Sequence, residues 1–341
     1  MQHKTSEQTR PLIDFVVLWV DGNDPEWLAK KAEYSPAATS DASPGRYRDW
    51  DNLRYWFRAV AKYAPWVRRI HFVSDGQVPA WLNTENEKIH IVSHKDYIPQ
   101  ENLPLFNSNA IEIGLHRIPD LAEHFVYFND DFFLCAPVAP DYYFHGGSPV
   151  DMAGLTRTAG THTTFGAMMS NNYAVLNRHF DKKKVLRKGA GKWFRLSYGK
   201  TLLRTVRNLG RPTFDGIVIP HLSVAYRKSD FERVWASEGK LLAETQQHRF
   251  REPSDLTHFL FRFYRLCQGD FYPRRARGRY FSVTSGKAAK EAADAICRRA
   301  YPEICINDCC EDETDFLAAK EAVCVAFAKT LPENCEFEKT V

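Results

Sequence analysis

The sequence predicts an α/β fold in which helices cover both faces of a parallel or mixed sheet. Four apolar stretches of strand length alternate with helical patterns over about 120 residues, which is typical of β-α units. Polar or acidic residues directly follow several of these stretches. Because open α/β sheets bind ligands at the carboxyl ends of their strands, the pattern also predicts a ligand site at that edge of the sheet.

The composition is that of a folded globular protein. The chain has 341 residues, of which 44% are hydrophobic and 13% aromatic, so it can bury one large core or two smaller ones. It has no run of eighteen apolar residues, and its first residues lack the apolar stretch of a secretory signal. We therefore expect a cytoplasmic protein, and the basic segment described below leaves a peripheral position at the inner face of the plasma membrane open.

The cysteines do not predict disulfides. Six of the eight lie between Cys297 and Cys335, and none of them forms a CxxC pair of the zinc-ribbon kind. In a reducing compartment we expect free, mostly buried thiols, with a C-terminal metal site as the alternative.

Apolar runs bounded by turn residues give the strongest strand signals. The expected strands are Ile13–Val20, Ile70–Ser74, Ile89–Val92, Phe125–Phe128 and Ile304–Asp308. Helical spacing of apolar residues predicts the helices Arg46–Tyr63, Asn107–Ile118, Lys228–Glu238 and Phe250–Tyr264. The expected N-caps are Asp51 for the first of these helices, Asn107 or Ser108 for the second, and Ser229 for the third.

These elements divide the chain into four expected parts. Residues 1–12 form a disordered leader and residues 13–150 form the α/β core. Residues 151–215 are a basic insertion or subdomain, and residues 216–341 complete the domain with C-terminal helices. This division follows from the looser pattern after Val150, where Gly and Thr are frequent.

Positive charge is concentrated between Arg178 and Arg211. This segment has twelve Lys and Arg residues and a single acid, Asp181, while the whole chain carries a net charge of only +4. The remainder of the chain is therefore net acidic. A solvated helical face also produces short charge runs, but a run of this length favours attraction to a polyanion or to an anionic membrane surface.

The strand Phe125–Phe128 runs directly into Asn129-Asp130-Asp131. Two adjacent carboxylates at the end of a buried strand are costly unless a cation or hydrogen bonds compensate them. Mg²⁺ prefers such oxygen ligands, usually one or two carboxylates together with substrate phosphates. Taken alone, the three residues fit an ordinary turn equally well. A second strand end, Asn307-Asp308, favours one metal site built from both strands.

Three long blocks have a more specific pattern. They are IDFVVLWVDGNDPEW (Ile13–Trp27), RYRDWDNLRYWFRAVAKYAPWVRRIHFVSDGQVPAWL (Arg46–Leu82) and LFNSNAIEIGLHRIPDLAEHFVYFNDDFFL (Leu105–Leu134). With the shorter pieces HLSVAY, FREPSDLTHFLFRFY and CIND they cover most of the chain as far as Asp308. The first three blocks resemble the first, second and third conserved regions of the Stealth family of sugar-phosphate transferases, which includes bacterial capsule polymerases and the animal lysosomal-enzyme GlcNAc-1-phosphotransferase.

The resemblance implies a glycosyltransferase-A-like (Rossmann-like) mixed sheet and makes residues 13–150 the nucleotide-sugar-binding core. It implies transfer of a hexose- or N-acetylhexosamine-1-phosphate from a UDP-sugar to an acceptor sugar hydroxyl, with a phosphodiester formed and UMP released. Capsule or cell-surface polysaccharide synthesis is the implied setting. The implied cofactor is Mg²⁺ or Mn²⁺, and the implied partners are a nucleotide-sugar donor and a polysaccharide or oligosaccharide acceptor. We expect no nucleic-acid partner, and the oligomeric state stays open.

The resemblance also implies roles for individual residues. Asp131, with Asp130 nearby, would hold the metal together with Asn307 and Asp308. Arg251 would stabilise the transferring phosphate, and His221 would act as the general base. Without the resemblance, His221 is interpreted as a structural histidine.

Other residues would bind the substrates. Asp21 and Gly22 would lie beside the nucleotide at the end of the first strand. The remaining substrate-binding candidates are Arg48, Asp49, Arg54, Asp75, Asn107, Ser108 and Glu112.

Two other functions stay open from the sequence. A conventional metal-dependent glycosyltransferase would use the same carboxylates at the strand end but would move the sugar without its phosphate. A non-catalytic polysaccharide- or membrane-binding protein would use residues 178–211 to bind anions and would leave the clustered acids unexplained.

Overall fold

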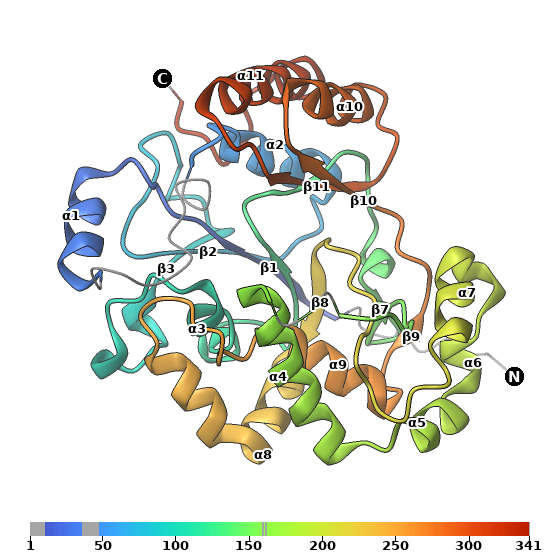
Figure 1. The fold of residues 1–341 in the computed structure, drawn as a ribbon. Coiled ribbons are helices and arrows are strands. Elements are labelled where there is room, and N and C mark those ends of the chain that lie inside the picture. Colours follow the sequence, from blue (N-terminus) through green and yellow to red (C-terminus); the bar gives the residue numbers. More distant parts are fainter. Residues whose placement is uncertain (1–10, 36–47, 159, 161, 341) are drawn as a thin grey trace, which may run out of the picture.

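A computed structural model describes residues 11–35, 48–158, 160 and 162–340. The expected leader therefore falls mostly outside the described residues, and so do Arg46 and Tyr47 at the start of the first expected helix. The central sheet has five strands in the order β3-β2-β1-β4-β8 (Figure 1). Its parallel strands are β1 (Ile13–Leu18), β2 (Ile70–Ser74), β3 (Ile89–Ser93) and β4 (His124–Phe128). β8 (Val224–Arg227) pairs antiparallel with β4, so the predicted mixed sheet is confirmed.

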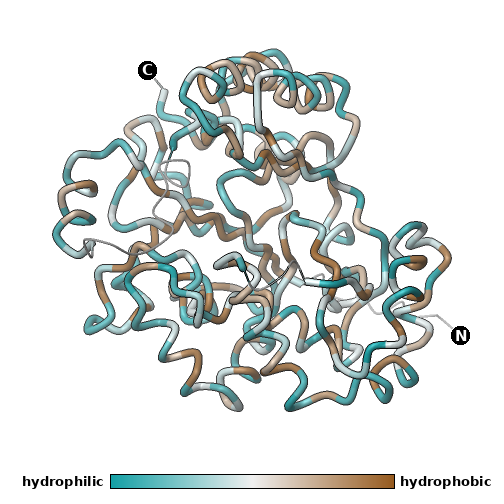
Figure 2. Tube along the Cα trace, in the orientation of Figure 1, coloured by the Kyte–Doolittle hydropathy of each residue, from teal (hydrophilic) through white to brown (hydrophobic). Residues whose placement is uncertain are grey.

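Helices cover both faces of this sheet, as predicted. Phe15 and Val17 of β1 belong to one hydrophobic cluster, and Val16 between them belongs to another. This alternation follows from the pleat of a strand. The first cluster contains residues of α2 (Leu53–Tyr63), α10 (Gly286–Cys297) and α11 (Glu313–Thr330). The second contains residues of α3 (Ser108–Glu112), α8 (Lys228–Gln247) and α9 (Phe259–Gln268). Figure 2 shows hydrophobic residues following the central strands.

A second sheet of three strands continues from the end of β4. It has the order β10-β11-β5, with β10 (Arg279–Val283), β11 (Glu303–Asp308) and β5 (Phe132–Leu134). β5 begins directly after the Asn129–Asp131 turn, and the backbone N–H of Ile306 donates to the carbonyl of Asp131 at 2.9 Å. This pairing brings the ends of β4 and β11 together, and these are the two strand ends that the sequence predicted to share a site.

The basic segment folds into short helices that pack beside α9. They are α5 (Lys182–Lys188), α6 (Ala190–Trp193) and α7 (Lys200–Arg207), and they follow α4 (Thr164–His179). A separate hydrophobic cluster joins this segment to α9, with Trp193 and Phe263 fully buried in it. The other elements are α1 (Pro25–Tyr34), the strands β6 (Phe144–His145), β7 (Ser148–Asp151) and β9 (Tyr272–Pro273), and 3₁₀ turns at His94–Asp96, Gln100–Asn102, Leu115–Arg117, Pro140–Tyr142 and Leu196–Tyr198.

The predicted strands match within two residues at each end, but the helix boundaries are less accurate. The cap of α2 is Asn52 rather than Asp51, whose φ is +51°. The expected helix from Asn107 to Ile118 is α-helical only as far as Glu112, although Asn107 caps it as predicted. Gly114 lies at the break, where an added Cβ would come within 2.9 Å of the Gln246 side chain. Close packing against α8 therefore shapes this segment more than helix propensity does.

Two later helices also differ from the prediction. α8 continues nine residues past Glu238, with a kink there, and its cap is Arg227 rather than Ser229. The helix expected from Phe250 begins only at Phe259, because the preceding residues are held in turns by side chains such as Asp255. All eight cysteines are free, but half of them, rather than most, are buried.

Buried ion pairs hold α9 against β7 and α8. Asp151 accepts from Arg262 at 2.7 Å and from Arg265 at 3.0 Å. Arg265 also donates to the buried Asp230 at 3.0 Å. Burial of two guanidinium groups is tolerated because each has a carboxylate partner.

We predict that Asp151→Ala lowers the free energy of unfolding by about 3–5 kcal/mol, since it leaves buried arginine charge uncompensated. Chemical denaturation measures this change. The control is Asp294→Ala on α10, which removes an exposed pair with Arg298 at 3.2 Å and should change the free energy by less than about 1 kcal/mol. An equal effect of the two substitutions would contradict the role given to Asp151.

Candidate active site

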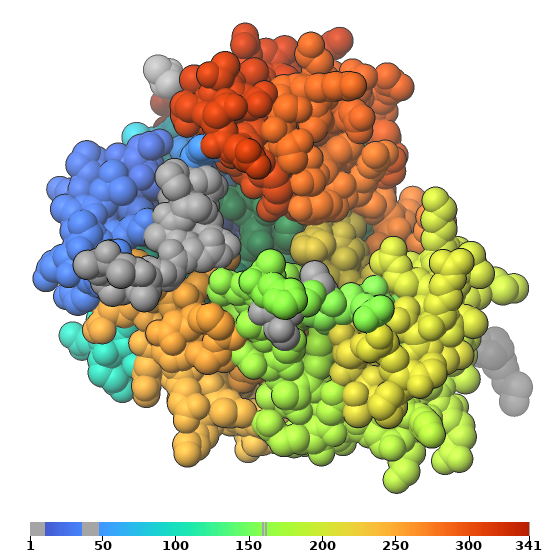
Figure 3. Space-filling view, viewed as in Figure 1, coloured from blue at the N-terminus to red at the C-terminus, as the bar shows by residue number. Residues whose placement is uncertain are grey.

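A cavity of about 990 Å³ opens at the carboxyl ends of the central strands. Its walls include the ends of β1, β2, β4 and β11, as expected for an α/β ligand site. Figure 3 shows a hollow in this face between the C-terminal helices, in orange and red, and the green segment around α4. Most predicted site residues line the cavity, namely Arg48, Asp49, Asp75, Ser108, Glu112, Asp130, Asp131, His221, Arg251, Asn307 and Asp308.

Asp130 and Asp131 form the acidic centre of the cavity. Asp130 is exposed on the cavity wall and Asp131 is half-buried. Desolvation by the surrounding cavity raises the pKa of Asp130 to about 6, with a further contribution from Asp49. Burial and the neighbouring Asp130 raise the pKa of Asp131 to about 7. The Oδ2 atom of Asp131 accepts from the Cys305 thiol at 3.3 Å, while its buried Oδ1 atom has no hydrogen-bond partner among the described residues. The pair is therefore poorly compensated as the protein stands.

The unpartnered oxygen fits an open Mg²⁺ site. Such a site uses one or two carboxylates and leaves other positions to water and substrate phosphates. Within the described part of the chain, no group of three His, Cys, Asp or Glu side chains is arranged to hold a metal. Asp308 accepts from the Cys310 backbone at 2.9 Å and lies 3.5 Å from Arg48. Metal binding by Asp131, Asn307 and Asp308 stays a prediction.

His221 lines the cavity from the segment that precedes β8. Its ring packs on Tyr280 with the centroids 4.9 Å apart. Burial lowers the pKa of His221, so the imidazole is neutral near pH 7 and can accept a proton. Its φ of +51° is unfavourable for a non-glycine residue, and such strain is concentrated at functional sites.

Arg251, Ser108 and Glu112 form a second polar group in the cavity wall. Arg251 donates to the Ser108 hydroxyl at the start of α3. Burial raises the pKa of Glu112 to about 7, and the nearby Arg251 opposes this shift. An arginine held beside a hydroxyl at the cavity wall can bind a phosphate oxygen, as predicted for Arg251.

Four predicted residues do not line the cavity. Arg54 lies 3.5 Å from Glu338 and packs over Trp81, so it braces the C-terminal segment. Asn107 is buried and connects the start of α3 to Asp255, to which it donates at 2.8 Å. Asp21 and Gly22 lie in the turn after β1, where the Asp21 carboxylate accepts from the Asn23 backbone. Arg54 and Asn107 thus have structural contacts within the protein, and their predicted substrate contacts stay predictions.

The structure also adds residues that the sequence did not indicate. Tyr280 enters the cavity because β10 pairs with β11, in a register that places it opposite Cys305. His258 lies at the start of α9, and burial lowers its pKa to about 3, so it is neutral. No local sequence pattern distinguishes either residue from an ordinary core aromatic side chain.

Comparison with known proteins identifies the family. The model for Stealth protein conserved region 1 matches residues 12–38, and that for conserved region 2 matches residues 46–150. The block Leu105–Leu134, which we expected to be a third conserved region, therefore falls inside the second.

Several curated relatives match nearly the whole chain. The exopolysaccharide phosphotransferase cps2G of Lactiplantibacillus plantarum is 39% identical over 96% of each chain. The capsular polysaccharide phosphotransferase WcwK of Streptococcus pneumoniae is 36% identical over 96% of this chain and 98% of its own. The receptor polysaccharide phosphotransferase WefC of Streptococcus gordonii is 36% identical, with the same coverage.

Among solved structures, apo mouse xyloside xylosyltransferase 1 matches 79% of this chain and 88% of its own, at 10% identity and a TM-score of 0.34. A TM-score this low does not support a conclusion about fold or activity. The predicted enzyme class, a sugar-phosphate transferase, is confirmed by the phosphotransferase relatives. On the strength of the two family regions and these full-length relatives, the chain belongs to the Stealth family.

Proposed function

We propose that this protein transfers a hexose- or N-acetylhexosamine-1-phosphate from a UDP-sugar to an acceptor sugar hydroxyl and releases UMP. The observation that carries the proposal is the adjacent pair Asp130 and Asp131 in the same cavity as Arg251 and His221. The buried Oδ1 atom of Asp131 has no hydrogen-bond partner among the described residues. Phosphoryl transfer needs charge neutralisation, in-line positioning and a base for the incoming hydroxyl, and these residues can supply all three.

Each residue has a distinct part in the proposed reaction. The acceptor oxygen bonds to the phosphorus that carries the sugar, and the bond from that phosphorus to UMP breaks, with the electron pair remaining on UMP. His221 takes the proton of the acceptor hydroxyl. Arg251 binds oxygens of the transferring phosphate. Asp131, with Asp130, Asn307 and Asp308 near it, would hold Mg²⁺ or Mn²⁺, which neutralises diphosphate charge when bound.

Product analysis tests this function directly. With a panel of nucleotide sugars and an acceptor oligosaccharide, we expect UMP to accumulate in step with a new phosphodiester. Asp131→Asn, His221→Ala and Arg251→Ala should each slow the reaction by about a hundredfold or more. The control is Asp120→Asn at an exposed position, which should turn over normally.

Two results would contradict the proposal. Release of UDP in place of UMP would assign the protein to the conventional glycosyltransferases. Near-normal turnover by two of the three cavity variants, in protein that is folded by circular dichroism, would refute the assignment of the site.

We also propose that the α5–α7 surface contacts an anionic membrane. Leu196, Leu203 and Val206 are 89%, 61% and 51% exposed among the basic residues of this segment. Exposed apolar side chains surrounded by Lys and Arg are typical of surfaces that lie in the interface of anionic bilayers. No helix of the described residues is long and apolar enough to cross a bilayer.

Vesicle sedimentation tests this contact. We expect the wild-type chain to sediment with phosphatidylglycerol vesicles and not with phosphatidylcholine vesicles. The double substitution Leu203→Asp and Val206→Asp should weaken binding at least about fivefold, because it removes apolar area and adds negative charge. Leu317→Asp with Val325→Asp on α11 is the matched control, since both residues are similarly exposed. Equal loss in the two double variants would exclude the α5–α7 surface.

A further inference from the structure

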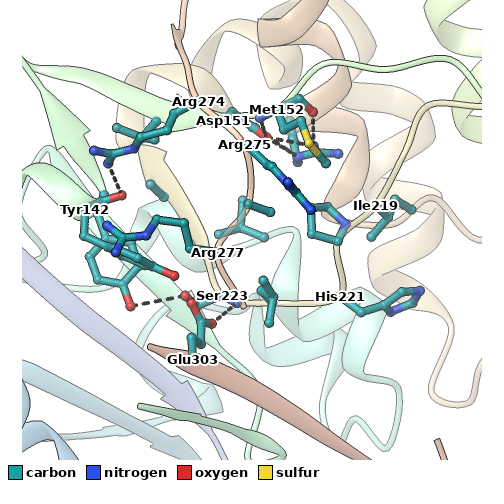
Figure 4. Close-up of a pocket in the computed structure, with 18 of the residues that line it drawn as sticks. Tyr142, Asp151, Met152, Ile219, His221, Ser223, Arg274, Arg275, Arg277 and Glu303 are labelled. Atoms are coloured by element: carbon teal, nitrogen blue, oxygen red, sulfur yellow. Dashed lines mark hydrogen bonds and ion pairs between the residues drawn. The ribbon is translucent and has the colours of Figure 1, made fainter. Parts of the chain in front are cut away.

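A second, smaller cavity of about 70 Å³ adjoins the active-site cavity. The two cavities share the wall formed by His221, Leu222 and Phe259. The lining also includes the end of β7 and the connection from β9 to β10, which contains Arg274, Arg275 and Arg277. Its other members are Tyr142, Tyr143, Arg262, Glu303 and residues around His221 in the segment 219–225. Figure 4 shows Arg274 and Arg277 on one side of this cavity and His221 on the other.

Two of these arginines have no hydrogen-bond or ion-pair partner among the described residues. Arg274 donates to the backbone carbonyls of Asp141 and Tyr142 and is thereby fixed in place. Arg275 and Arg277 are exposed and form no hydrogen bond or ion pair with any other residue that the structure describes. Two guanidinium groups at the mouth of one cavity repel each other, so they favour an anion between them.

The acids of this cavity do not neutralise the arginines. The Asp151 carboxylate forms ion pairs with Arg262 and Arg265. Glu303 is buried, accepts from the Ser223 backbone at 2.5 Å, and has its pKa raised to about 7 by burial. Neither carboxylate forms an ion pair with Arg275 or Arg277 among the described contacts. The cavity therefore keeps a net positive lining.

The size of the cavity limits the ligand. Cavities that enclose whole small molecules measure about 300–1,000 Å³, so a space of about 70 Å³ holds one anionic group, and the rest of a larger ligand would lie outside it. Guanidinium groups bind phosphate through paired hydrogen bonds. A phosphate group is thus the ligand chemistry that this lining fits best.

We propose that Arg275 and Arg277 bind a phosphate group of the acceptor. This inference rests on the proposed function, in which His221 receives the proton of the acceptor hydroxyl. An acceptor whose phosphate is held on one side of His221 would present its hydroxyl on the other side, in the active-site cavity. The phosphate could come from a phosphodiester earlier in the polysaccharide or from a diphosphate that joins the acceptor to a carrier.

The position of Arg275 connects this site to the basic surface. A Cβ added at Gly199, directly before α7, would lie 3.9 Å from the Nη1 atom of Arg275. Lys200, Arg204 and Arg207 of α7 continue the positive charge away from the cavity. An anionic acceptor can therefore follow one positively charged path from the α5–α7 surface to His221.

Binding of two phosphate probes tests the site without requiring turnover. Dimethyl phosphate represents the phosphodiester and methyl diphosphate represents the carrier linkage, and their binding to the full chain is measured by phosphorus NMR. We expect Arg275→Ala with Arg277→Ala to weaken binding of the preferred probe at least about tenfold, since two charge-assisted contacts are lost. The probe that binds more tightly to the wild-type chain identifies the source of the phosphate.

Arg279→Ala is the matched control. Arg279 belongs to the same run of arginines, but it does not line the cavity, and it contacts the Tyr301 hydroxyl at 3.1 Å and Glu291 at 3.9 Å. It should change probe binding by less than about twofold. Unchanged binding in the Arg275 and Arg277 double variant, or an equal loss in Arg279→Ala, would overturn the proposal.

Steady-state kinetics then place the site in the reaction. The double variant should raise KM for a phosphate-bearing acceptor about tenfold and leave kcat and the donor KM unchanged. A neutral acceptor of the same sugars should show no such rise, and an equal rise for both acceptors would contradict the site. If Asp131→Asn binds the probes like the wild-type chain while no nucleotide sugar yields UMP, the phosphate site is supported and the proposed function fails.

Discussion

The site depends on one electrostatic constraint, the placement of Asp130 and Asp131 side by side in the cavity at the carboxyl end of the central strand β4. Asp130 raises the pKa of Asp131, and Asp49 raises that of Asp130, so this group of acids favours a cation. One oxygen of Asp131 is buried without a partner in the described protein. A fold optimised for stability alone would not keep it. The rest of the cavity is arranged around this uncompensated charge.

The three-stranded sheet β10-β11-β5 completes the site around these acids. β5 follows them immediately and pairs with β11, which brings Cys305, Asn307 and Asp308 to their side. β10 then pairs with β11 and adds Tyr280, on which His221 packs. Residues nearly two hundred positions apart thereby meet at one edge, and His221, Asp130, Asp131 and Arg251 share one cavity.

Much of the fold could be predicted because apolar runs of strand length and their polar ends are local signals. β2 was predicted without error, and the meeting of Asp131 with Asn307 and Asp308 followed from the shared strand-end pattern. The helices after Asn107 and Phe250 could not be placed because tertiary contacts of Gly114 and Asp255 override helix propensity there. That Arg54 and Asn107 do not line the cavity could not be predicted, since a charged or polar residue in a motif gives no sign of the direction of its side chain. Metal binding remains a prediction that the geometry of Asp131 supports.

Direct measurement of metal binding tests the central claim most simply. Mn²⁺ can be titrated into the full chain in the presence of UDP, with free Mn²⁺ followed by electron paramagnetic resonance. Our account predicts that UDP tightens Mn²⁺ binding and that Asp131→Asn, which preserves side-chain shape, weakens it at least about tenfold. Equal Mn²⁺ affinity in the wild-type chain and in Asp131→Asn would show that the uncompensated carboxylate serves some purpose other than holding a cation.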